Sequence, residues 1–102
     1  MPKYQYERLY VSAYEPRDFD PRDPLALRKA VEHLKTVPQS SFVQLTVEVT
    51  IRAGNFIVKA PAAMKLDEII GKTPKQVWAI FDREIDRQVD YFEARSRGWS
   101  QD

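Results

Sequence analysis

The segment 41–60, SFVQLTVEVTIRAGNFIVKA, constrains the fold more than any other part of the chain. From Val43 to Arg52 apolar residues alternate strictly with polar ones, which is the period-two pattern of a strand with one buried and one exposed face. Gly54-Asn55 follows, and a glycine at the first central position suits a two-residue type II′ turn. We therefore predict a β-hairpin. Its cross-strand pairs, all on the buried face, are Ala53 with Phe56, Ile51 with Val58 and Val49 with Ala60.

Length and composition favour one intracellular domain. A chain of 102 residues with 43% hydrophobic residues can build one core, so we expect a single domain over residues 1–102. The net charge is only +1, so nucleic-acid binding would need a local basic patch. The absence of cysteine excludes disulfides and thiolate chemistry, and the abundant charges of both signs are typical of thermophile proteins. The N-terminal residues show neither a signal peptide nor a membrane span, so we expect a cytoplasmic protein with no membrane partner.

The first third of the chain predicts a strand, a loop and a helix. Residues 3–14 alternate as a strand, with its aliphatic side toward the core and its tyrosines on the other side. Residues 15–24 are rich in proline and aspartate, which predicts a loop anchored by Phe19. Apolar residues then recur at helical spacing from Leu25 to about Thr36, where Pro38 ends the helix.

Two helices are predicted after the hairpin. Residues 61–70 predict a short helix ended by Gly71. Thr73 and Gln76 then form a capping box, and a long helix is predicted from Pro74 to about Arg95, ended by Gly98. Its core-facing stripe consists of Val77, Trp78, Phe81, Ile85, Val89 and Phe92, while Ile80 and Tyr91 lie to one side as a second apolar patch.

These elements predict an α+β fold in the order β-α-β-β-α-α. The sheet would have three mostly antiparallel strands, with the helices packed on one face. The first strand could pair with either strand of the hairpin. Because such a sheet leaves one face and two edges exposed, dimerisation by face or by edge is expected.

Residues that would indicate an enzyme or a metal site do not occur in the required patterns. His33 is the single histidine and is expected at the surface. The acidic groups at 18–23 and 82–86 alternate with arginines, which is typical of surface salt bridges. Position 66 is leucine where a phosphate-binding loop ending at Gly71-Lys72-Thr73 requires glycine. We therefore expect no catalytic residue, no metal ligand and no cofactor, although a hydrolase that uses only carboxylates or tyrosines is a third class of function.

The exposed side of the sheet is the candidate binding surface. Tyrosines of the predicted first strand would lie beside the polar residues of the hairpin, and such a surface suits a subunit interface, a captured peptide or stacked bases. The tyrosines could also simply cover the sheet. Our leading hypothesis is a non-enzymatic, homodimeric protein-binding module; the alternative is a nucleic-acid- or ribosome-associated protein. The candidate partner-binding residues are Tyr6, Arg8, Tyr10, Tyr14, Thr46, Arg52 and Lys59, with Tyr91, Arg95 and Trp99 at the end of the long helix.

The run from Glu84 to Val89, EIDRQV, is similar to an acid-Arg-Gln-aliphatic run in the last helix of the ribosome hibernation-factor family. The similarity covers this helix only. One strand of that family is missing, extra residues separate the hairpin from the helix, and no strongly basic groove is evident. We therefore do not assign the chain to that family.

Overall fold

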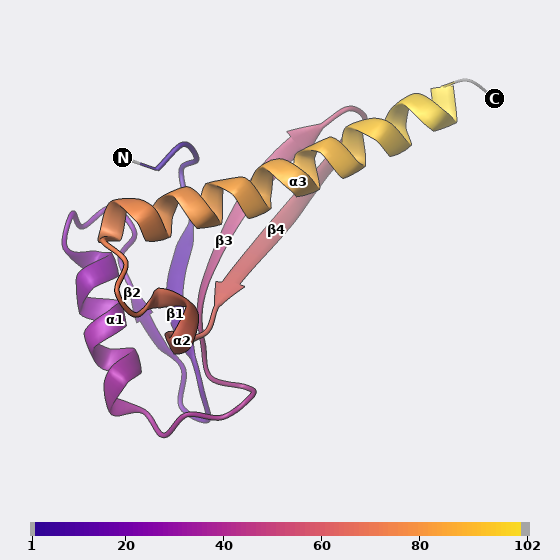
Figure 1. The fold of residues 1–102 in the computed structure, drawn as a ribbon. Coiled ribbons are helices and arrows are strands. Elements are labelled where there is room, and N and C mark those ends of the chain that lie inside the picture. The colour runs from indigo at the N-terminus through magenta and orange to yellow at the C-terminus, as the bar shows by residue number, and fades with distance from the viewer. Residues whose placement is uncertain (1, 101–102) are drawn as a thin grey trace.

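The computed structural model describes the backbone of residues 2–100 and the side chains of residues 2–98. Its strands form one antiparallel sheet in the order β2-β1-β3-β4, and the helices pack on one face of it (Figure 1). The predicted α+β class is confirmed, but the sheet has four strands instead of three. The elements are β1 (Arg8–Ser12), β2 (Arg17–Phe19), α1 (Ala26–Thr36), β3 (Gln44–Ala53), β4 (Phe56–Met64), α2 (Leu66–Ile69) and α3 (Pro74–Ser100).

The hairpin of β3 and β4 has the predicted register. Ala53 pairs with Phe56, Ile51 with Val58 and Val49 with Ala60. Gly54 has φ of +60° and Asn55 has no positive φ, as a type II′ turn requires. The two-residue turn therefore fixes which side chains of both strands face the core.

The strand β4 is longer than predicted, and the helix predicted over 61–70 is wrong in its first half. Strand pairing continues through Pro61, which lies opposite Glu48, to Met64. Since β4 is an edge strand, a proline without an N–H group is tolerated there. The Pro61 carbonyl accepts a hydrogen bond from the Gln88 side chain of α3 at 2.7 Å. Only one helical turn, α2, remains before Gly71, whose φ of +83° ends it as predicted.

The fourth strand arises within the segment that predicted a loop. β2 pairs with the outer edge of β1, so that Leu9 lies opposite Phe19. Three of the four residues between Pro16 and Pro21 suffice for β2, because an edge strand needs hydrogen bonds on one side only. Phe19 packs against the core, as predicted for this loop. The predicted first strand over 3–14 is correspondingly too long, since β1 covers only Arg8–Ser12.

The long helix α3 packs its predicted stripe against the sheet. Val77, Phe81 and Ile85 are buried, and the rest of the stripe is half-buried. The capping box is confirmed: the Thr73 N–H donates to the Gln76 side chain at 2.8 Å, and the Gln76 N–H donates to the Thr73 hydroxyl at 3.2 Å. The predicted end at Gly98 is wrong, because the helix continues to Ser100. Gly98 has no left-handed φ that would end a helix.

The tip of the hairpin docks on the last third of α3. The Asn55 N–H donates to the Ser96 hydroxyl at 2.9 Å, and Ser96 is buried although it is polar. A Cβ atom at residue 54 would overlap the Ser96 side chain. Glycine is therefore required at position 54 for two reasons: its backbone has a positive φ, and α3 approaches it too closely for a side chain.

We predict that Gly54→Ala lowers the free energy of unfolding by roughly 2 to 5 kcal/mol, since it adds left-handed strain to overpacking against Ser96. Urea denaturation followed by circular dichroism measures this change. Gly98→Ala is the matched control, because a Cβ there meets no atom and the helix gains up to about 1 kcal/mol. Equal stability of Gly54→Ala and the wild type would contradict the described contact.

Candidate functional site

No element of the described chain covers the face of the sheet opposite the helices (Figure 1). We call it the open face. Strand alternation assigns its members, which come from all four strands. They are Arg8, Tyr10, Ser12, Asp18, Gln44, Thr46, Glu48, Thr50, Arg52, Ile57, Lys59, Pro61 and Ala63.

A compact charged cluster lies around Arg8, on the side of the open face formed by β1 and β2. The Arg8 guanidinium lies over the Tyr10 ring at 3.8 Å and contacts Asp18 at 3.0 Å and Glu48 at 3.8 Å. The Tyr10 hydroxyl also reaches Glu48, at 3.4 Å. Burial, followed by the Glu48 charge, raises the pKa of Tyr10. Tyr10 lies directly opposite Thr46, which is only 7% exposed although no helix covers it.

The charges of the open face are separated along the hairpin. Near β1 and β2 lie Asp18, Glu48 and Glu7, whose carboxylate accepts a hydrogen bond from the Thr50 hydroxyl at 2.7 Å. Arg8 is the single cation among them. Toward the hairpin tip lie Arg52 and Lys59, on adjacent strands, and no carboxylate of the described residues forms an ion pair with either. The face therefore has an acidic end and a basic end. Its formal charges balance when Glu7, which precedes β1 and reaches the face at Thr50, is counted with its members.

Two tyrosines predicted for this surface lie on the other side of the sheet. Tyr6 is 7% exposed, stacks on Trp78 of α3 with a centroid distance of 5.1 Å, and donates its hydroxyl proton to Asp82 at 2.7 Å. The Tyr4 hydroxyl donates to Asp86. The predicted placement is wrong because the sheet begins at Arg8, and the residues before it cross to α3.

The N-terminal segment is tied to α3 by further polar contacts. The backbone N–H of Lys3 donates to Asp82 at 2.9 Å, and its ammonium group contacts Asp86 at 2.7 Å. The hydrogen bonds from Lys3 and then from Tyr4 lower the pKa of Asp86. A sequence signal for this site does exist, since Trp78, Asp82 and Asp86 recur every four residues and so share one side of the helix.

The remaining predicted residues lie apart from the open face. Tyr14 is 100% exposed beyond the end of β1. Tyr91 and Arg95 lie on α3 and contact each other, with Arg95 donating to the Tyr91 hydroxyl at 3.3 Å. The side chain of Trp99 lies outside the described residues. The structure thus brings together Arg8, Tyr10, Thr46, Arg52 and Lys59, whereas sequence reasoning assigned no partner role to Glu7, Asp18 or Glu48.

The described chain offers neither a metal site nor a helix that could span a membrane. No group of three histidine, cysteine, aspartate or glutamate residues there is placed to hold a metal ion. No helix in residues 2–100 is both long and apolar enough to cross a bilayer. Comparisons with protein-family models, with curated proteins and with solved structures found no match to this chain. Function must therefore be inferred from the surfaces themselves.

The buried Tyr6 predicts how stability depends on pH. Burial, strengthened by the hydrogen bond to Asp82, raises the pKa of Tyr6. An unfolded chain releases a tyrosine proton near pH ~10, so the folded state holds this proton more tightly. The resulting stabilisation is complete below that pH and is lost as the pH rises above about 10.

We therefore expect the free energy of unfolding to fall steeply above pH ~10, and to fall less steeply in Tyr6→Phe, which has no proton to release. Urea denaturation at several alkaline pH values measures the slope. Tyr14→Phe is the control, because it removes a tyrosine hydroxyl from a fully exposed side chain. If Tyr6→Phe retained the wild-type slope, Tyr6 would not be the group that controls alkaline stability.

Proposed function

We propose that this chain is a non-enzymatic assembly module that forms a homodimer through its open face. The observation that carries the proposal is the separation of charge on an uncovered sheet, with carboxylates at one end and Arg52 and Lys59 at the other. In a two-fold interface each residue contact occurs twice, so two ends of opposite charge can face each other in both copies. A second copy rotated by half a turn supplies this arrangement.

Other partners match the open face less well. A polyanion would meet Glu7, Asp18 and Glu48 at one end, and a polycation would meet Arg52 and Lys59 at the other. The exposed Ile57 lies at the basic end, opposite Arg52, and Pro61 and Ala63 of the same strand extend this apolar area past Lys59, away from the hairpin tip. Apolar contact supplies most of the affinity of an interface, while charges set its register.

Pairing through the sheet edges is the less favourable way to dimerise. On the outer edge of β4, Pro61 cannot donate a hydrogen bond, and its carbonyl is already bonded to Gln88. The other edge strand, β2, has only three residues. Proline, lysine and short length are the features by which natural sheets prevent edge pairing. The open face therefore remains the better interface.

A charge-exchange experiment tests the proposal. The double variant Arg52→Glu/Lys59→Glu makes both ends of the face acidic, and Glu7→Arg/Asp18→Arg makes the acidic end basic. We expect each variant alone to be monomeric and an equimolar mixture to form heterodimers, because complementary ends then meet again. Sedimentation velocity of the wild type, the two variants and the mixture measures the masses.

The matched control is Lys75→Glu/Arg83→Glu, which changes the same number of charges at exposed positions of α3. It should remain dimeric. A monomeric wild type would overturn the proposal, as would variants that keep the dimer mass. Circular dichroism of each variant establishes that its fold is intact.

A second candidate function is nucleic-acid binding through Arg8, Arg52 and Lys59, because no carboxylate of the described residues forms an ion pair with Arg52 or Lys59. The neighbouring carboxylates oppose it, since phosphate contacts dominate such affinity. We expect no binding of fluorescently labelled single-stranded or duplex oligonucleotides in low-salt buffer. Binding that weakens steeply with added salt would instead favour this function over the dimer.

A further inference from the structure

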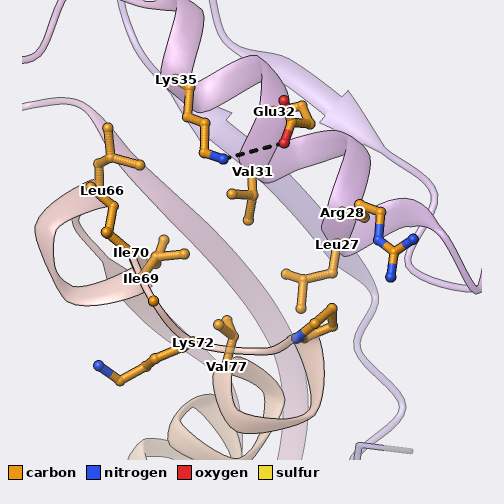
Figure 2. A pocket seen from close by; sticks show the side chains of 12 residues that line it. Leu27, Arg28, Val31, Glu32, Lys35, Leu66, Ile69, Ile70, Lys72 and Val77 are labelled. Atoms are coloured by element: carbon orange, nitrogen blue, oxygen red, sulfur yellow. Dashed lines mark hydrogen bonds and ion pairs between the residues drawn. The ribbon is translucent and has the colours of Figure 1, made fainter.

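A groove lies between α1, α2 and the start of α3, away from the open face. Its volume is about 390 Å³. Figure 2 shows aliphatic side chains from three segments pointing toward one another around it: Leu27 and Val31 of α1, Leu66, Ile69 and Ile70 of the α2 region, and Val77 of α3. Leu27, Ile69 and Val77 are buried, whereas Ile70 is 63% exposed at the mouth. The groove is therefore an extension of the core that reaches the surface.

The groove exists because the helices above it do not close over the core. The single turn of α2 is all that lies between α1 and the start of α3 (Figure 1). Since β4 extends to Met64, few residues remain to fill this space before Gly71. An exposed isoleucine beside an apolar cavity is unfavourable in water, and a ligand that covered both would remove that cost.

The rim of the groove is positively charged. Arg28, Lys35 and Lys72 line it with one acid, Glu32, which pairs with Lys35 at 3.3 Å. Within residues 2–98, neither Arg28 nor Lys72 has a carboxylate at ion-pair distance. Arg28 also borders a shallower depression that contains Arg17 and His33. An anionic group at the mouth beside Arg28 would meet a cation that forms no ion pair with any described residue.

We propose that this groove binds a small amphiphilic anion, with an apolar chain on the aliphatic floor and one carboxylate or phosphate beside Arg28. Its volume falls within the roughly 300 to 1,000 Å³ of small-molecule sites, which are also lined by apolar residues with a few polar groups. The aliphatic lining and the basic rim together select for this ligand, since each matches one half of it. The inference is independent of the homodimer, because the groove and the open face lie on opposite sides of the sheet.

Isothermal titration calorimetry with decanoate, kept below its micelle concentration, tests the proposal. We expect one saturable site. Decyltrimethylammonium has the same chain with the opposite charge, and acetate has the charge without the chain, so neither should bind. Equal binding of decanoate and decyltrimethylammonium would show hydrophobic adsorption only. Absence of decanoate binding would also overturn the proposal. Binding of an acidic amphipathic peptide instead of decanoate would not rescue it.

Two exposed positions separate the contributions of the lining and of the rim. Ile70→Glu places a carboxylate at the mouth, and Arg28→Glu reverses the charge of the rim. Arg28→Glu removes a charge-assisted contact, and Ile70→Glu replaces apolar area with a carboxylate that repels the ligand, so each should weaken decanoate binding about tenfold or more. Arg83→Glu, on the exposed side of α3, should bind as the wild type does. Wild-type affinity in both groove variants, with circular dichroism unchanged, would place the ligand elsewhere.

Discussion

The packing of α3 along the hairpin is the interaction on which the rest of the structure depends. α3 has 27 residues, or about 40 Å at the usual rise, so it needs a partner longer than an ordinary strand. The ten residues of β3 with β4 supply that partner, and Ser96 locks the far end against the turn. This pairing makes the molecule elongated, with extents of 51 × 27 × 22 Å. Because the apolar faces of α1 and α3 both pack on one side of the sheet, the other side is left open.

The N-terminal tyrosines show how strongly α3 attracts the rest of the chain. Their alternation is compatible with a strand, yet contact with α3 stabilises Tyr6 more. There Trp78 stacks on its ring and Asp82 accepts a hydrogen bond from its hydroxyl. On the open face the same ring would lie in water. Burying an aromatic ring with its hydroxyl satisfied is the more favourable outcome. The helix thus removes two tyrosines from the surface that the sequence pattern assigned to them.

Features that depend on residues close together in the sequence were predicted well, and features that depend on contacts between distant segments were not. The hairpin register, the capping box and the stripe of α3 depend on neighbouring residues, and all three were predicted correctly. The end of β4, the pairing of β2 and the position of Tyr6 depend on which element lies beside them in space. Pro61 reads as a strand breaker unless β4 is known to be an edge strand. The candidate site follows the same division. The strand residues Arg8, Tyr10, Thr46, Arg52 and Lys59 share the open face, whereas Tyr6 and Tyr14, which lie outside the strands, are not on it.

One imbalance between helix and sheet area accounts for both surfaces that we consider functional. α1 covers β1 and β2, α3 covers β3 and β4, and the single turn of α2 is too short to close the space between them. The shortage of helix leaves the groove on one side, and the absence of any second layer leaves the open face on the other. The two surfaces are nevertheless joined through the core. α1 lines the groove and packs on β1, and β1 carries Arg8 and Tyr10 on the open face. Any influence of a groove ligand on self-association would therefore act through the packing of α1 against β1, because the open face shares no lining residue with the groove.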